Sequence, residues 1–273
     1  MIGVRNMDHV IIKANNIQEG WFKAIKSCVE VGHTYTIDKG EYEGQKRKEF
    51  DMVTLHIENP GLRPLACQSQ FITPTTDEKI EKYFQEYLMN PEFASEEEAK
   101  NNRYKYASWI APNWMKACDL LTHGMGGCNQ ATISLGPDLN SKSVKIQQVA
   151  GDEQLTMDYE LEEIDKHPPC LRIIDMRVRY GKLHFIIYFR SWDLIAGYPE
   201  NMGGIQLLKE WCLNYINLIL QERGDNELED GTIIACSKGM HIYQHFWPIV
   251  KEYVGPHSIL DSNPKDTGIW IIK

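Results

Sequence analysis

Residues 168–193 read PPCLRIIDMRVRYGKLHFIIYFRSWD, and this stretch decides the fold. Ile, Phe and Tyr are frequent in Leu171 to Val178 and in Leu183 to Phe189, and the residues between these runs, 179–182, include the turn signal Tyr-Gly. Two β-rich runs joined by a short glycine-containing segment are typical of strand, tight turn and strand. We therefore predict two neighbouring strands that carry polar groups at their ends.

Further elements are predicted outward from this hairpin. Apolar residues recur every 3.6 positions from Ile205 to Ile219, which predicts a long buried helix. We also expect a strand at Met52 to Ile57 that ends in Asn59-Pro60-Gly61, helices at Asp77 to Leu88 and Trp114 to Leu121, and a short strand at Thr232 to Cys236. Two polar segments are predicted to lack regular structure: a mobile basic loop at 40–48 and a surface insertion around 137–165.

Composition fits an ordinary globular protein. Of the 273 residues, 42% are hydrophobic and 25% are charged, and no repeat or linker interrupts them. We predict one domain spanning 1–273, of class α+β, with α/β as the alternative. The formal net charge of −9 disfavours broad electrostatic attachment to nucleic acid or anionic lipid.

Cysteine usage and hydropathy suggest where the protein works. Seven cysteines are an odd number, and they are widely spaced with no CxxC pair. The chain shows no apolar leader and no run long enough to span a bilayer, so we expect a cytoplasmic protein with reduced thiols and no membrane partner. His241 and His245 lie four residues apart without a third ligand nearby, and we predict no metal.

Candidate reactive groups lie at the ends of the predicted hairpin. Cys170 follows Pro168-Pro169, which restricts the backbone before it and presets the thiol. A buried cysteine that only packs is the alternative. Beyond the second strand, Arg190, Ser191, Asp193 and Asn201 form a set of donors and acceptors for an anionic, polar ligand. A salt-bridged strand end is the alternative there.

Four motifs in register resemble thymidylate synthase. They are His167-Pro168-Pro169-Cys170, Arg190-Ser191-x-Asp193, Gly197-x-Pro199-x-Asn201 and His241-Ile242-Tyr243. The arginine follows the cysteine by twenty residues and the asparagine follows the aspartate by eight, as in that family. The match covers roughly Pro168 to Tyr243 and is closer to the shorter archaeal and pyrimidine hydroxymethylase branches.

The resemblance implies a fold and a set of roles. The fold would be a kinked mixed β-sheet with packed helices, paired sheet to sheet in a homodimer. Cys170 would add to C6 of a pyrimidine nucleotide, and C5 would take a one-carbon unit from 5,10-methylenetetrahydrofolate or a related reduced pterin. The resemblance also assigns binding roles: Arg190 and Ser191 at the phosphate, Asp193 at the pterin, Asn201 at the base edge, and His241 and Tyr243 at the sugar.

Some positions depart from the family pattern. Typical members bring two adjacent arginines from the partner subunit to the phosphate, and the counterparts here are Asn129 and Gln130. Arg47 is the candidate for a mobile phosphate-binding arginine, with a solvated Lys-Arg-Lys run as the alternative. Trp109 and Tyr106 are candidates for lining a pterin pocket, with core packing as the alternative. The C-terminal residues 268–273 are apolar and differ from the family's usual closing tail.

The leading hypothesis is therefore a thymidylate synthase-like one-carbon transferase. Asn201 favours a uracil nucleotide, because an amide complements both N3–H and O4. A CMP or dCMP hydroxymethylase is the first alternative, and a non-catalytic nucleotide- or pterin-binding family member is the second. The sequence leaves open a methyl or hydroxymethyl product, the sugar, folate or methanopterin, and the pathway.

Overall fold

A computed structural model describes residues 6–38, 42–68, 74–101, 104–123, 128–136, 145–146, 157–158, 168–255 and 269–272. Its secondary structure is mixed, which confirms the α+β class. In the described part of the chain, no helix is long and apolar enough to cross a membrane.

A mixed seven-stranded sheet forms the centre of the fold, with strand order β13-β1-β4-β11-β9-β8-β5. β1 pairs in parallel with β13 on one side and with β4 on the other, whereas β4 and β11 run antiparallel and β8 pairs antiparallel with both β9 and β5. The bounds are β1 His9–Ala14, β4 Met52–Ile57, β5 Thr132–Ser134, β8 Leu171–Arg179, β9 Lys182–Phe189, β11 Glu229–Ser237 and β13 Ile269–Ile272.

Smaller sheets complete the β structure. A four-stranded sheet has the order β10-β12-β3-β2, with β10 Trp192–Asp193, β12 Met240–Tyr243, β3 Lys46–Glu49 and β2 His33–Thr36. A two-stranded sheet joins β6 Lys145–Ile146 to β7 Met157–Asp158, and these four residues are the described part of the predicted insertion around 137–165. The rest of that insertion lies outside the described residues, as do His167 and residue 268 of the tail.

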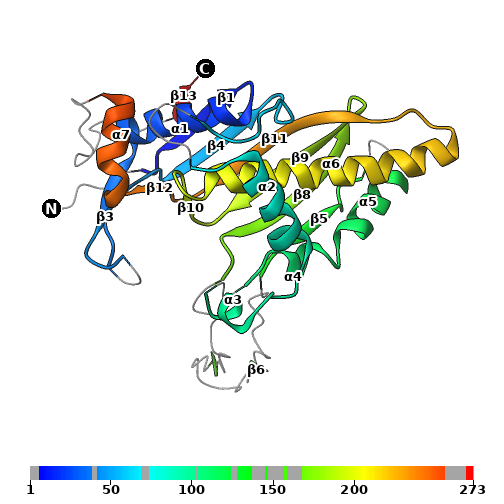
Figure 1. Ribbon diagram of the computed structural model, residues 1–273, viewed down its shortest axis with the longest axis horizontal. Helices are drawn as coiled ribbons and strands as arrows, with labels where there is room; N and C mark the ends of the chain where they lie inside the picture. The colour runs from blue at the N-terminus through cyan, green and yellow to red at the C-terminus, as the bar shows by residue number, and fades with distance from the viewer. Residues whose placement is uncertain are drawn as a thin grey trace, which may run out of the picture.

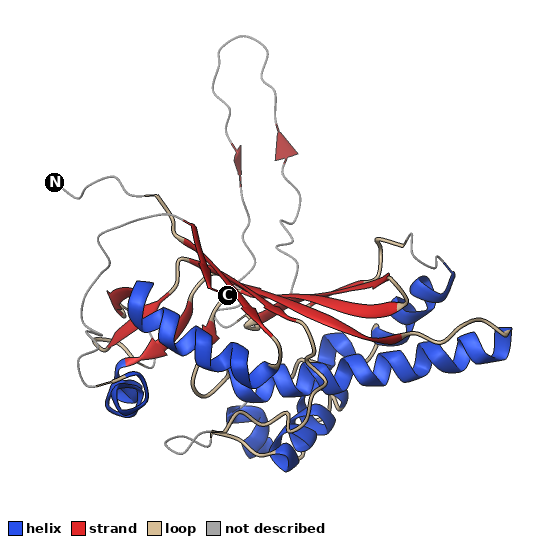
Figure 2. Ribbon diagram, turned by 90° about the horizontal axis from the view of Figure 1, so that it is seen from above, coloured by secondary structure: helices blue, strands red, loops and turns tan. Residues whose placement is uncertain are grey.

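Helices cover one face of the large sheet. In Figures 1 and 2, α1 Ile17–Val31, α2 Asp77–Tyr83 and α6 Tyr198–Arg223 lie on the same side of it. α6 packs on β9 and β11, and α1 packs on β1 and β4. The remaining helices are a π-helical segment η1 Phe84–Met89, α3 Glu96–Asn101, α4 Ala107–Ile110, α5 Trp114–His123, a 3-10 turn η2 Gln244–Phe246, and α7 Trp247–Val254.

Local sequence explains the main boundaries. Tyr180 and Gly181 both have positive φ, 55° and 71°, as a two-residue hairpin turn between right-twisted strands requires. α6 has a proline in its first turn and ends at Gly224, whose φ of 73° closes the helix in the left-handed region. Alternate residues of β9 are fully buried on the helix side, so the predicted hairpin and long helix are confirmed and make the core together.

The polar segment around residue 47 differs from the prediction. Residues 46–49 form strand β3, which is paired on both sides, so this part of the expected loop is wrong. Lys48 is 1% exposed inside this sheet. Strand pairing to β2 and β12 orders a sequence with no apolar alternation, because neighbouring strands satisfy its backbone groups. Residues 40 and 41 of the expected loop lie outside the described residues.

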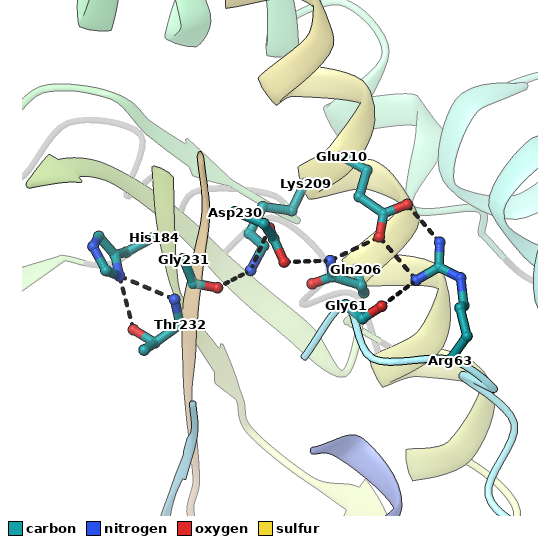
Figure 3. Close-up of polar contacts among 9 residues, drawn as sticks. All are labelled: Gly61, Arg63, His184, Gln206, Lys209, Glu210, Asp230, Gly231 and Thr232. Atoms are coloured by element: carbon teal, nitrogen blue, oxygen red, sulfur yellow. Dashed lines mark hydrogen bonds and ion pairs between the residues drawn. The ribbon is translucent and has the colours of Figure 1, made fainter. Parts of the chain in front are cut away.

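A buried polar network joins α6, β11 and the loop after β4 (Figure 3). Lys209 has no exposed side-chain surface, and its Nζ lies 3.1 Å from an Asp230 oxygen and donates to the Gly231 carbonyl. Gln206 links Asp230 to Glu210, and Glu210 receives two hydrogen bonds from Arg63. A Cβ at position 231 would lie 2.5 Å from the Leu183 carbonyl oxygen, so only glycine fits at this bulge in β11.

Burial lowers the pKa of Lys209 from 10.5 to about 8. Between these values the unfolded chain binds the proton more tightly than the native protein, so this group makes stability rise with pH. We expect the wild type to gain about 1–3 kcal/mol between pH 7.5 and pH 10 relative to Lys209→Met. Urea unfolding at both pH values measures this, and comparing variants cancels the contributions of buried thiols and tyrosines.

Lys182→Met is the matched control, because Lys182 is 44% exposed in its ion pair with Glu229. It should follow the wild-type pH profile within about 0.5 kcal/mol. Equal profiles for all three proteins would contradict the assignment of a depressed pKa to Lys209.

Candidate active site

Cys170 lies at the entrance to β8, half-buried, where the two sheets meet. The backbone N–H of Arg190, just beyond β9, donates to the Cys170 carbonyl at 2.9 Å. A bulge follows at once, between Leu171 and Ile173 in the β8–β9 pairing. Bulges re-aim side chains at strand ends. The pairing therefore fixes the cysteine and the arginine beside each other, as the twenty-residue spacing predicts for the ends of one hairpin.

The Arg190 guanidinium holds the turn that leads to the cysteine. Nη2 donates to the Pro168 carbonyl at 2.6 Å, and Nε lies 3.2 Å from the carbonyls of both Pro168 and Pro169. These bonds use two of the three guanidinium nitrogens, and Nη1 carries two more N–H donors. The side chain therefore supports the nucleophile's backbone and is a candidate anion ligand at the same position.

β10 and β12 bring the later motifs to this point. Trp192 and Asp193 pair with Met240 and His241 in parallel register. Oδ1 of Asp193 accepts the backbone N–H groups of Ile195 and Ala196, at 2.8 and 2.9 Å, and so closes the turn before α6. Ser191 is half-buried in the preceding turn, between Arg190 and β10.

His241 has one ring nitrogen available for a ligand. It is 2% exposed, and Nδ1 lies 2.8 Å from the Gly239 carbonyl, which can only accept, so Nδ1 carries the proton. Burial lowers the pKa of His241 and keeps the ring neutral. Nε2 is buried and is without a hydrogen-bond partner among the described residues. It is therefore set to accept a hydrogen bond, for instance from a hydroxyl group.

Tyr243 and Arg47 face each other across the β12–β3 pair. Burial, followed by the Asp193 carboxylate, raises the pKa of Tyr243 to about 12 against the opposing effect of Arg47. The phenol therefore remains a donor at neutral pH. Arg47 Nε lies 2.7 Å from Glu49 Oε2, so this arginine is an ion-paired strand residue rather than part of a solvated run.

Four tyrosines form a packed aromatic cluster that reaches the backbone of Cys170. The hydroxyls of Tyr104 and Tyr106 accept the backbone N–H groups of Cys170 and Leu171, at 3.1 and 3.2 Å. Tyr87 packs edge-on against Tyr106 and stacks on Tyr83. Burial, followed by the electrostatic effect of the neighbouring Cys170 side chain, raises the pKa of Tyr104 to about 12. The sequence predicts only that Tyr83 and Tyr87 lie in the helix at Asp77 to Leu88; their i, i+4 spacing, which places both on one helix face, is the signal that could have grouped them.

The remaining candidates are less central. Tyr106 is buried and supports Leu171 through its hydroxyl, while Trp109 packs edge-on against Tyr104 at 6.3 Å. Asn129 and Gln130 are exposed beside β5, where Ala131 bonds to Met176. Six strand residues separate Met176 from Cys170, roughly 20 Å, so these amides do not reach the site of their own chain.

Away from Cys170, one cluster of histidine and aspartate side chains consists of groups that could bind a metal ion. In the described part of the chain, Asp8, His33 and Asp51 bring ligand atoms within 4.8 Å of one another. They are bonded among themselves, since His33 Nε2 lies 3.1 Å from Asp8 Oδ2 and the Asp8 N–H donates to Asp51. The two histidines considered from the sequence lie elsewhere, His241 in β12 and His245 in the η2 turn, and do not share a helix.

Comparison with known proteins agrees with the motif analysis. Curated proteins named "Putative thymidylate synthase" match this chain along most of its length. The protein from Methanosarcina acetivorans is 24% identical over 244 residues, which are 89% of this chain and 94% of the relative. Those from Methanosarcina barkeri and Methanothermobacter marburgensis are 23% and 22% identical, cover 89% of this chain, and are themselves covered to 94% and 97%. No family model matches. The chain is thymidylate synthase-like in sequence, and its resemblance to this family is confirmed.

Proposed function

We propose that this protein transfers a one-carbon unit from 5,10-methylenetetrahydrofolate, or a related reduced pterin, to C5 of a pyrimidine nucleotide. The proposal rests on one arrangement of residues. A 2.9 Å backbone hydrogen bond joins Arg190 to Cys170, and Asp193, His241 and Tyr243 lie on the adjoining sheet. The relatives named for thymidylate synthesis support the same chemistry.

The proposed reaction uses these residues in order. The Cys170 thiolate adds to C6 of the ring, which makes C5 a carbon nucleophile towards the methylene carbon of the co-substrate. The C5 proton then leaves to a base and the pterin nitrogen leaves the transferred carbon, which gives an exocyclic methylene at C5 while the sulfur stays bonded to C6. Arg190 and Arg47 bind the phosphate, Asp193 faces the pterin, and His241 Nε2 and the Tyr243 hydroxyl bind the sugar hydroxyl. Hydride from the reduced pterin converts the exocyclic methylene at C5 to a methyl group, whereas addition of water converts it to a hydroxymethyl group. In both cases the sulfur is expelled from C6 as the C5–C6 bond becomes double again.

The test is release of tritium from 5-tritiated pyrimidine nucleotides in the presence of methylenetetrahydrofolate. Release depends on loss of the C5 proton, and therefore reports both possible products. A 5-fluoro nucleotide cannot lose its fluorine in this way, and should leave a covalent complex of protein, nucleotide and co-substrate. Absence of both tritium release and the complex, across uracil and cytosine nucleotides of both sugars, would favour a non-catalytic binding protein.

We further propose that two chains pair through the uncovered face of the large sheet. Half-buried residues alternate with the core residues along β1, β9 and β11, and this alternation places Ile11, Ile186 and Ile234 on the face opposite the core. Figure 2 shows the helices gathered on the other face of the sheet. Ile173 on the same sheet is 39% exposed. The bulges in β8 and β11 support the kinked sheet of this family, because bulges bend strands. A second chain would also bring its Asn129 and Gln130 towards the phosphate.

Sedimentation of the purified protein is expected to show a species of two chains. Ile234→Lys places a charge at the centre of the uncovered face and should shift the protein to single chains. Leu218→Lys, on the outer side of α6 where Leu218 is 61% exposed, is the matched control and should leave two chains. A wild-type protein that sediments as single chains at micromolar concentration would contradict the proposal.

A further inference from the structure

The side-chain amide of Asn201 is held at both ends. Asn201 is the fourth residue of α6 and is half-buried. Its Oδ1 accepts a hydrogen bond from the indole Nε1–H of Trp192 at 3.0 Å, and its Nδ2 donates to the Tyr83 hydroxyl at 2.8 Å. The resemblance to thymidylate synthase puts this amide at the base edge but assigns nothing to the two residues that hold it.

The two holding residues differ in what they require of the amide. An indole N–H only donates, so the oxygen end of Asn201 must face Trp192. A phenol hydroxyl both donates and accepts, so Tyr83 would tolerate either end, and burial keeps it protonated by raising its pKa well above 10. Trp192 alone therefore decides which way the amide points.

Trp192 is itself fixed by packing. Its side chain is 2% exposed, it stacks on Phe189 at 4.0 Å with an interplanar angle of 9°, and it packs on Tyr198 at 5.1 Å. Its backbone N–H donates to the Gly239 carbonyl at 3.2 Å. The indole therefore cannot turn its N–H away to let the amide rotate without disrupting the core.

A fixed amide distinguishes the two pyrimidines. One lone pair on Oδ1 and one N–H on Nδ2 remain for a ligand. Uracil presents a donor at N3 and an acceptor at O4, whereas cytosine presents an acceptor at N3 and a donor at N4. For one placement of the ring, the donor and acceptor positions of uracil are therefore exchanged in cytosine. An amide that can flip pairs with both bases, whereas an amide that cannot flip pairs with only one of them.

Building on the proposed function, we propose that Trp192 is a positioning residue that sets the selectivity between uracil and cytosine nucleotides by fixing the orientation of Asn201. A flipped amide would lose the hydrogen bond from Trp192 and place two donors in contact, at a cost of about 1.4–2.7 kcal/mol. That energy corresponds to roughly a 10-fold to 100-fold preference between the two bases.

The experiment compares kcat/KM for tritium release from the uracil and the cytosine nucleotide, in the sugar series that turns over. In Trp192→Phe the amide is free to flip, and the ratio of the two values should fall at least about tenfold towards one. Tyr83→Phe is the matched comparison: it removes the other hydrogen bond, so both values should fall while their ratio stays as in the wild type. A ratio that is unchanged in Trp192→Phe, or that falls equally in both variants, would overturn the inference.

A second substitution separates selectivity from packing. Placing 3-benzothienylalanine at position 192 keeps the shape of the indole but replaces its N–H by sulfur, so the core remains filled even if Trp192→Phe does not fold. The analogue should lose selectivity as Trp192→Phe does, and retained selectivity would overturn the inference. Failure of the wild type to release tritium from any pyrimidine nucleotide would instead count against the proposed function.

Discussion

Replacing Cys170 by serine is expected to abolish tritium release and covalent trapping, with a loss in kcat of at least about 10³-fold. A serine hydroxyl is nearly the same size as a thiol, so the packing at the start of β8 should persist. Its hydroxyl is not ionised at neutral pH, however, and it is a weak nucleophile towards C6. Mass spectrometry of the protein after incubation with a 5-fluoro nucleotide and methylenetetrahydrofolate measures the adduct directly.

Cys236→Ser is the matched control. Cys236 is another half-buried free thiol, located in β11, where its sulfur lies 3.6 Å from the Thr54 hydroxyl. This variant should still form the covalent adduct, and the modified peptide should contain Cys170. An adduct that persists in Cys170→Ser, or one that maps to a different cysteine, would refute the proposed mechanism.

The second large effect is expected for Arg190→Lys, with a fall in kcat/KM of about 10²-fold to 10³-fold. A lysine ammonium cannot reproduce three contacts to the Pro168 and Pro169 carbonyls while also facing a phosphate. The turn before Cys170 should loosen and the nucleotide should bind more weakly. Steady-state kinetics on the tritiated nucleotide, with nucleotide affinity measured by calorimetry, separates the two contributions.

Arg63→Lys tests whether replacing any arginine that donates two hydrogen bonds would lower kcat/KM to the same extent. Arg63 donates from two nitrogens to Glu210, beside the buried network of Figure 3 rather than beside the cysteine. We expect this variant to retain kcat/KM within about threefold, because a partly exposed ion pair contributes little. If Arg190→Lys behaved in the same way, Arg190 would not have the proposed role.

Much of the fold could be predicted because its central elements have strong local patterns. The hairpin from Leu171 to Phe189 alternates apolar residues around a tight turn, and α6 repeats them every 3.6 residues. β3 was not predicted because its polar residues show no apolar alternation, and its order depends on pairing with β2 and with β12, which is distant in sequence. The π-helical segment η1 likewise continues the predicted helix at Asp77 to Leu88 in a geometry that apolar spacing does not reveal.

The residues of the candidate site likewise include some that the sequence places together and some that only the tertiary structure brings together. Cys170 and Arg190 lie at the two ends of one strand-turn-strand unit and Asp193 follows Arg190 by three residues, so their spacing alone places them near one another. Tyr83 and Trp192 could not be linked to Asn201 from the sequence, because 118 residues separate Tyr83 from Asn201 and the link depends on how α2 packs on α6. Motifs identify reactive groups, whereas the residues that orient those groups come from tertiary contacts.

The pairing of β13 with β1 has a consequence for biosynthesis. β1 is the first strand of the large sheet and β13 the last, and they align in parallel from His9–Ile269 to Ile12–Ile272. A growing polypeptide on the ribosome therefore keeps one edge of β1 unpaired until residue 272 has been made. Open strand edges template unwanted association. Nascent or C-terminally truncated chains are thus the species for which a chaperone would matter most.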